Sequence, residues 1–216
     1  STDSAEAMPA RPRIGLLGIM QALYDHMIPG ITERQDAYAQ ELGDALAGVA
    51  DVEVAAPARD RDDIDRTVSD FQRRGLDGLL VVMLTYGPAM RVSRALSHTQ
   101  LPICLANVQP VPGVTAAWDM ADLTYNQGIH GAQDTANAMV RAGRAFHVVT
   151  EEPPAGAFRE QIGRWAAAAA AVTRWRSLKL GVFGAAMTVM RDITVGVPAL
   201  LPSLVPRRPA LPHRLL

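Results

Sequence analysis

The chain has 216 residues, of which 49% are hydrophobic and 20% are charged, and its formal net charge is −1. This composition favours a globular core and excludes a chain that is disordered over most of its length. A net charge near zero provides no field that would attract nucleic acid or anionic lipid, so we expect neither as a partner. No apolar run reaches the ~18 residues of a membrane span, and the first residues lack a signal-peptide pattern, so we expect a cytoplasmic protein without a membrane partner.

Apolar and amphipathic segments then alternate along the chain. Short apolar runs predict buried strands, and apolar residues at helical spacing predict the helices between them. The predicted strands are 13–18, 52–56, 78–84, 101–106 and 145–149. The predicted helices are 32–47, 61–74, 88–97 and 133–142. Thr32 is a plausible N-cap for the first helix. This alternation predicts an α/β fold, a flavodoxin-like parallel sheet with helices on both faces.

Three predicted loops follow strands of this sheet, at 19–30, 85–88 and 107–131. Open α/β sheets bind ligands outside the carboxyl ends of their strands, and unusually long loops in compact domains are often functional. We therefore expect a site at this edge of the sheet.

The loops carry several candidate binding residues. Gln21 and Tyr24 offer an amide and a phenol, which suit sugar hydroxyls but could equally hydrogen-bond within their own loop. Asn126, Gln127 and His130 could contact a ligand, or they could cap the helix that follows.

Other single residues have more ordinary interpretations. Trp118 could stack on a sugar or anchor its loop. His147 lies within a predicted strand and is expected at the core or the sheet edge. Cys104, the single cysteine, is expected to be a buried thiol that forms no internal disulfide.

Several chemistries have no pattern in this sequence. The five histidines are scattered without a metal-ligand spacing, so no metal site is predicted. The glycines of Gly15-x-x-Gly18 lack the third glycine of a dinucleotide loop, and no serine lies in a nucleophile elbow. The residues alone therefore predict no catalytic group.

The last part of the chain changes in character. A helix over 157–176 is expected to link residues 12–155, one α/β domain, to the truncated start of a second α/β domain. The linking helix and that domain's first strand would occupy 156–195, and 196–216 is a proline-rich tail. We expect this tail to be foreign to the fold, from a truncation or a frame change. The alternative is an extended arm that docks on another subunit.

Four segments together resemble the amino-terminal portion of L-arabinose isomerase, within the L-arabinose and L-fucose isomerase family. Gln21-Ala-Leu-Tyr24 resembles its Gln-x-Leu-Tyr, and Thr85-Tyr-Gly-Pro-Ala89 resembles its Thr-Phe-Ser-Pro-Ala. Asn126-Gln-Gly-Ile-His-Gly131 is similar to its Asn-Gln-x-x-His-Gly, and Phe183-Gly-Ala-Ala-Met187 to its Phe-Gly-x-x-Met. At position 25 this chain has aspartate where the family pattern has glycine.

The resemblance implies a chemistry of sugar catabolism. These isomerases interconvert an aldose and a ketose with a divalent metal, usually Mn²⁺, held by glutamates and histidines later in a longer chain. The resemblance thus implies no catalytic residue, metal ligand or cofactor within this chain, and we expect no activity from it alone.

The resemblance also implies binding roles for particular residues. It assigns contact with the sugar, L-arabinose or a similar pentose, to Gln21, Leu23, Tyr24, Gln127, His130 and Met187. Gln127 and His130 would reach the site of a neighbouring subunit, which implies a homo-oligomer.

Two other interpretations stay open. One is a non-catalytic sugar-binding or regulatory flavodoxin-like module. The other is a flavin-binding or redox domain, which the absence of a Ser/Thr-rich phosphate loop after the first strand disfavours.

Overall fold

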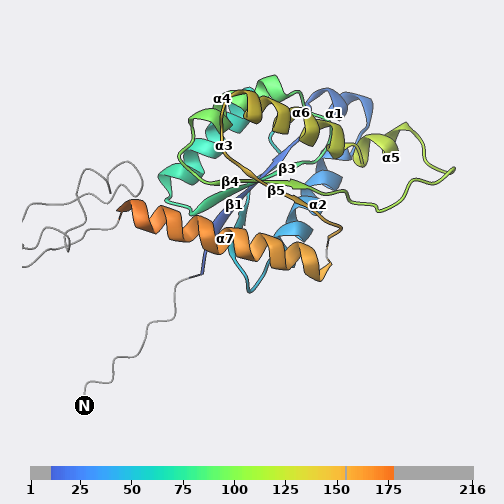
Figure 1. Cartoon of the computed structure of the whole chain (residues 1–216). Helices are drawn as coiled ribbons and strands as arrows, with labels where there is room; N and C mark the ends of the chain where they lie inside the picture. Colours follow the sequence, from blue (N-terminus) through green and yellow to red (C-terminus); the bar gives the residue numbers. More distant parts are fainter. Residues whose placement is uncertain (1–10, 154, 178–216) are drawn as a thin grey trace, which may run out of the picture. The chain divides into compact units, whose positions relative to one another are not determined.

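A computed structural model of the chain describes residues 11–153 and 155–177, and it shows a five-stranded sheet flanked by helices (Figure 1). The strands are β1 Arg13–Ile19, β2 Asp51–Val54, β3 Gly78–Met83, β4 Ile103–Asn107 and β5 His147–Thr150. Their order is β2-β1-β3-β4-β5, and every neighbouring pair is parallel. This is the flavodoxin-like order, so the predicted fold is confirmed.

The helices agree with the sequence pattern except around the carboxyl edge of the sheet. They are α1 Leu23–Met27, α2 Ile31–Ala45, α3 Arg61–Arg73, α4 Ala89–His98, α5 Met120–Tyr125, α6 Gly128–Arg141 and α7 Gly156–Ser177. The short helices α1 and α5 lie inside segments predicted as loops. Helix α6 begins at Gly128 and not at Gln133 as predicted.

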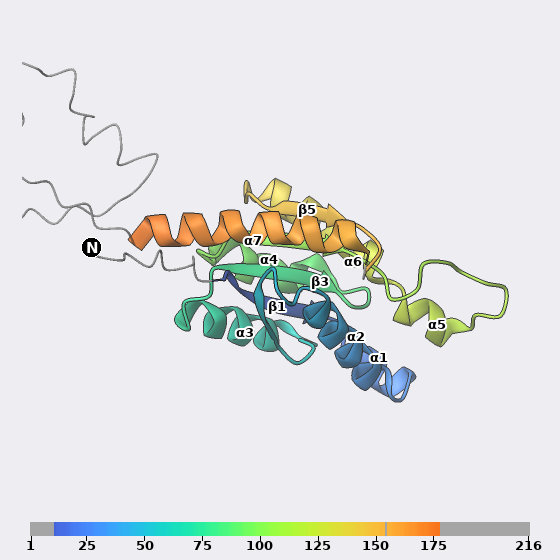
Figure 2. The same cartoon turned by 90° about the horizontal axis from the view of Figure 1, so that it is seen from below.

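Two apolar layers cover the two faces of the sheet. Figure 2 shows the layers from below. Helices α2 and α7 pack on the face that includes Leu16 and Leu80. Helices α3, α4 and α6 pack on the face that includes Leu17 and Val81. Every residue of β3 is buried because it lies at the centre of the sheet, and this explains its uninterrupted apolar sequence.

Helix α7 belongs to this packing over its first half. Phe158, Ile162 and Trp165 are buried against the sheet. At the start of β3, a Cβ on Gly78 would lie 2.9 Å from the Trp165 ring, so glycine makes room for this side chain.

The chain divides into two compact units, Ser1–Ala170 and Ala171–Leu216. The predicted strand of a second domain, Met187 and the proline-rich tail all lie outside the described residues. The domain boundaries expected from the sequence therefore stay predictions. No helix in the described part of the chain is both long enough and apolar enough to cross a membrane.

Candidate functional site

The order of the strands places a topological switch point between the carboxyl ends of β1 and β3. These strands are neighbours, but the chain leaves β1 for α2 on one face and β3 for α4 on the other. Such a switch point is where open α/β sheets bind ligands. The segments that border it are 20–24 after β1 and 84–88 after β3.

The structure brings Gln21 and Tyr24 together at this switch point. The Gln21 side chain hydrogen-bonds the Tyr24 hydroxyl, as the loop-internal interpretation of these residues anticipated. Partial burial raises the pKa of Tyr24, the nearby Tyr86 adds to this, and the hydrogen bond from Gln21 acts in the opposite direction. Tyr24 is therefore a neutral donor and acceptor at neutral pH. Leu23 points outward and is mostly exposed.

In the motif that begins at Asn126, residues that support the fold alternate with residues that solvent can reach. Asn126 is buried, and its side-chain amide exchanges two hydrogen bonds of 3.0 Å with the main chain of Val111. The main-chain carbonyl oxygen of Asn126 accepts a 2.9 Å hydrogen bond from the Gln109 side chain. Asn126 therefore holds the preceding loop in place, and its polar groups are committed to the fold.

Glycines in the same motif allow α6 to approach the end of β3. A Cβ on Gly128 would lie 2.0 Å from the carbonyl oxygen of Met83, and one on Gly131 would lie 3.2 Å from the nitrogen of Gly87. Asp134, one turn further along, accepts a 3.1 Å hydrogen bond from the first amide of α4, at Ala89. The start of α6 is thus fixed directly beside the switch point.

Gln127 and His130 are the polar side chains of the motif that reach the surface. Gln127 is half-buried at the N-cap of α6, and His130 is exposed on its first turn. Neither side chain has a hydrogen bond or ion pair to another residue in the described ranges. Both are available to a ligand or to a neighbouring molecule.

A buried glutamine that the sequence reasoning missed connects the two halves of this edge. Gln35 of α2 is fully buried, and its Nε2 donates to the carbonyl oxygens of Leu84 at 2.7 Å and Tyr125 at 2.8 Å. The adjacent Arg34 lies 3.7 Å from the centre of the Tyr125 ring and 3.6 Å from the Asp122 carboxylate. Helix α2 therefore holds α5 against the end of β3.

The sequence did contain a signal for Gln35. Ile31, Tyr38 and Leu42 are buried on the inner face of α2, and Gln35 lies four residues after Ile31 on this stripe. A lone polar residue within an apolar stripe indicates a buried hydrogen-bonding role.

Comparison with protein families agrees with this geometry. The family model for the L-arabinose isomerase N-terminal domain matches residues 14–177. The chain belongs to this family. No curated protein matches it. The match covers three of the four resembling segments, and Met187 lies beyond it.

The described His, Cys, Asp and Glu side chains of this L-arabinose isomerase N-terminal domain do not gather into a metal site. Residues 11–153 and 155–177 include no group of three His, Cys, Asp or Glu side chains that could hold a metal ion. His147 is exposed on the edge strand β5, and the His98 ring lies 2.8 Å from the carbonyl oxygen of Arg94. The described side chains therefore do not fit a divalent metal.

Cys104 and the residues at the start of α5 lie away from the switch point. Cys104 is buried in β4, and burial raises its pKa to about 12, so it is a structural thiol as predicted. Asp119 caps α5 in a reciprocal capping box with Asp122, which explains the order of this short helix. The neighbouring Trp118 is half-buried.

The described part of the chain also has several pockets, and one of them borders the motif at Ile129. A cavity of about 300 Å³ lies at the carboxyl ends of β4 and β5, with Asn107, Thr150 and Glu152 in its lining. A groove of about 620 Å³ lies between the carboxyl ends of α3 and α4, at the opposite edge of the sheet.

Proposed function

We propose that this chain supplies part of the substrate-pocket rim of an aldose–ketose isomerase that acts on L-arabinose or a similar pentose. One observation carries the proposal: a member of the L-arabinose isomerase N-terminal domain family presents Gln21, Tyr24, Gln127 and His130 around the carboxyl ends of β1 and β3. Amide, phenol and imidazole groups both donate and accept hydrogen bonds, as binding of sugar hydroxyls requires.

The chemistry of isomerisation separates the role of the rim residues from that of the catalytic groups. Moving a proton from the carbon beside a carbonyl needs a positioned base and a group that stabilises negative charge. We propose that a full-length isomerase supplies both, with Mn²⁺, from parts of the protein other than this rim. The rim residues would bind and orient the sugar, and the chain alone would not turn it over.

We also propose that the chain assembles into a homo-oligomer through α1 and α5. Exposed apolar side chains gather on these two helices: Leu23 is 57% exposed, Met27 64%, Met120 73% and Leu123 41%. Figure 1 shows α5 on an extended segment that projects from the sheet, near the start of α6. Apolar side chains grouped on a surface mark contact sites, and a partner here would lie next to Gln127 and His130.

The assembly can be tested by sedimentation. We expect the double variant Met120→Glu, Leu123→Glu to shift the chain toward the monomer. Met90→Glu is the matched control, because Met90 is 78% exposed but lies on α4. Identical sedimentation of the double variant and the wild type would exclude α5 from the contact.

The rim itself is tested by separating binding from turnover. Purified chain with Mn²⁺ and L-arabinose should form no ketose above a no-protein control, and formation of ketose would contradict the proposal of a rim without a catalytic centre. Saturation-transfer NMR should detect L-arabinose on the wild-type chain and a weaker signal on Gln127→Ala, His130→Ala. Equal signals would remove these two residues from the rim.

A chimera distinguishes the rim from a sugar-binding module. Residues 14–177 of this chain would replace the corresponding domain of an active L-arabinose isomerase. Restored turnover supports the proposed rim. Sugar binding by the chain together with an inactive but folded chimera supports the non-catalytic module.

A further inference from the structure

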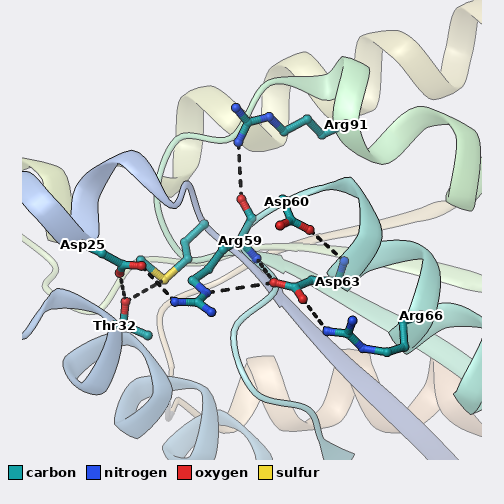
Figure 3. A network of polar contacts seen from close by, with 8 residues as sticks. Asp25, Thr32, Arg59, Asp60, Asp63, Arg66 and Arg91 are labelled. Atoms are coloured by element: carbon teal, nitrogen blue, oxygen red, sulfur yellow. Dashed lines mark hydrogen bonds and ion pairs between the residues drawn. The ribbon is translucent and has the colours of Figure 1, made fainter.

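Arg59, in the connection between β2 and α3, joins several segments at the carboxyl edge of the sheet (Figure 3). Its guanidinium lies 3.0 Å from the Asp25 carboxylate, and its main-chain nitrogen donates to Asp63 at 3.1 Å. Its carbonyl oxygen accepts hydrogen bonds from the Ala22 nitrogen at 3.4 Å and from Arg91 at 3.3 Å. One residue thus ties the segment after β1 to α3 and α4.

Asp25 completes this connection toward α2. Its other carboxylate oxygen accepts a hydrogen bond from the Thr32 hydroxyl. The predicted role of Thr32 as N-cap is therefore wrong: the N-cap is Gly30, with φ of 84°, and the Thr32 side chain is used to hold Asp25. Hydrogen bonding from Thr32 first, and Arg59 next, lowers the pKa of Asp25, so the carboxylate is charged at neutral pH.

The main chain of Ala58, next to Arg59, also forms hydrogen bonds with the end of β1 and with the segment that follows it. Ala58 donates to the carbonyl oxygen of Gly18 at 2.8 Å, and its own carbonyl oxygen accepts from Met20 at 3.0 Å. Gln21 and Tyr24 follow immediately. Gln21 therefore lies between the contacts at Met20 and Ala22, and Tyr24 lies between the contact at Ala22 and the ion pair at Asp25.

Helix α1 needs these contacts because its own structure provides little stability. It has five residues, none of them buried, and no side-chain cap. Isolated helices of this length do not form in water, since the cost of nucleation exceeds the gain from so few hydrogen bonds. The order of Leu23 and Tyr24 must therefore come from contacts outside the helix.

We propose that Arg59 is a positioning residue for the substrate rim: through Asp25 and the Ala22 amide it holds Gln21 and Tyr24 at the switch point. The inference rests on the proposed function, because Gln21 and Tyr24 are taken as rim residues. Arg59 acts on the sugar only through these neighbours.

A positioning role differs from a merely stabilising one in what it changes. The side chains of Arg59 and Asp25 are 47% and 25% exposed, and ion pairs at such surfaces add little to global stability. Loss of Arg59 should therefore leave the melting temperature nearly unchanged and loosen residues 20–27. A stabilising role alone would lower the melting temperature and leave residues 20–27 as protected as the rest of the edge.

The test compares Arg59→Met with Arg59→Lys and with Arg66→Met as the matched control. Arg66 also pairs with the Asp63 carboxylate, but it has no contact with α1. Amide hydrogen exchange of residues 20–27 should become about three- to tenfold faster in Arg59→Met, the range expected for one lost ion pair with its hydrogen bond. Arg59→Lys should recover part of the protection, and Arg66→Met should match the wild type.

Sugar binding supplies the second measurement. L-arabinose should bind Arg59→Met several-fold more weakly than Arg66→Met. Asp25→Asn keeps the shape of the side chain and removes its charge, so it should reproduce the faster exchange even if Arg59→Met folds poorly. Wild-type exchange rates at 20–27 in both Arg59→Met and Asp25→Asn would overturn the positioning role. Failure of the wild type to bind sugar, with faster exchange in the variants, would instead contradict the proposed function.

Discussion

Gly128→Ala tests whether the close approach of α6 to β3 is a real packing constraint. The added Cβ would lie 2.0 Å from the Met83 carbonyl oxygen, whereas such contacts essentially never fall under 3.0 Å, so α6 or β3 must move by at least 1.0 Å (3.0 − 2.0). The obstacle is main chain at the centre of the sheet and cannot rotate away. Overpacking of this kind costs about 1–3 kcal/mol, while replacing a helical glycine by alanine gains up to about 1 kcal/mol.

Because an approach of 2.0 Å to main chain is severe, we take the upper end of this cost, about 3 kcal/mol, less the gain of about 1 kcal/mol, and expect Gly128→Ala to lower the free energy of unfolding by about 2 kcal/mol in urea titrations. Gly113→Ala is the matched control, because a Cβ at Gly113 meets nothing within 4 Å and its φ is not positive. Gly131→Ala should be milder, since its closest contact is the flexible end of Met83, 2.8 Å away. Equal stability of Gly128→Ala and Gly113→Ala would refute the close approach of α6 to β3.

Three further expectations follow from single polar groups. Gln35→Leu leaves the buried carbonyl oxygen of Leu84 and the part-buried carbonyl oxygen of Tyr125 without this donor, and it should lower the free energy of unfolding by about 1–3 kcal/mol, measured by urea titration beside Gln40→Leu as an exposed control on the same helix. Tyr38→Phe removes a buried hydroxyl that has no hydrogen-bond partner among the described residues, so the melting temperature should stay level or rise; a clear fall would show that the hydroxyl is bonded in solution. Asp25, which faces Thr32, Arg59 and His26, should titrate by NMR below its ordinary pKa of 3.8; its contribution to stability is then present above that pH and is lost as the pH falls through the lowered pKa, and a midpoint above 3.8 would contradict the contact with Arg59.

The sequence by itself determined the elements that have a local period. Residues 78–84 predicted a central strand because a strand covered on both faces is apolar throughout, and β3 is such a strand. Residues 61–74 predicted a helix with leading acids and a terminal arginine, and α3 agrees with this pattern. The family, too, was indicated by short motifs that can be recognised in the sequence alone, and the match over residues 14–177 confirms it.

The prediction from sequence was wrong for very short helices and for glycine, which can either end a helix or allow it to pack closely. Helices α1 and α5 have five and six residues, too few to show a helical period. The two glycines at the start of α6 resembled a loop, since glycine commonly ends helices. They are required there because the helix lies against main-chain atoms of β3.

Only the tertiary structure decided how the candidate site is held together. Gln35 reaches Tyr125 across 90 positions of sequence, and Arg59 reaches Asp25 across 34. No local pattern encodes such pairs, because they exist only once the strand order β2-β1-β3 has brought the segments to one edge. The sequence thus named Gln21, Tyr24, Gln127 and His130 as candidates, and the fold supplied the contacts that place them.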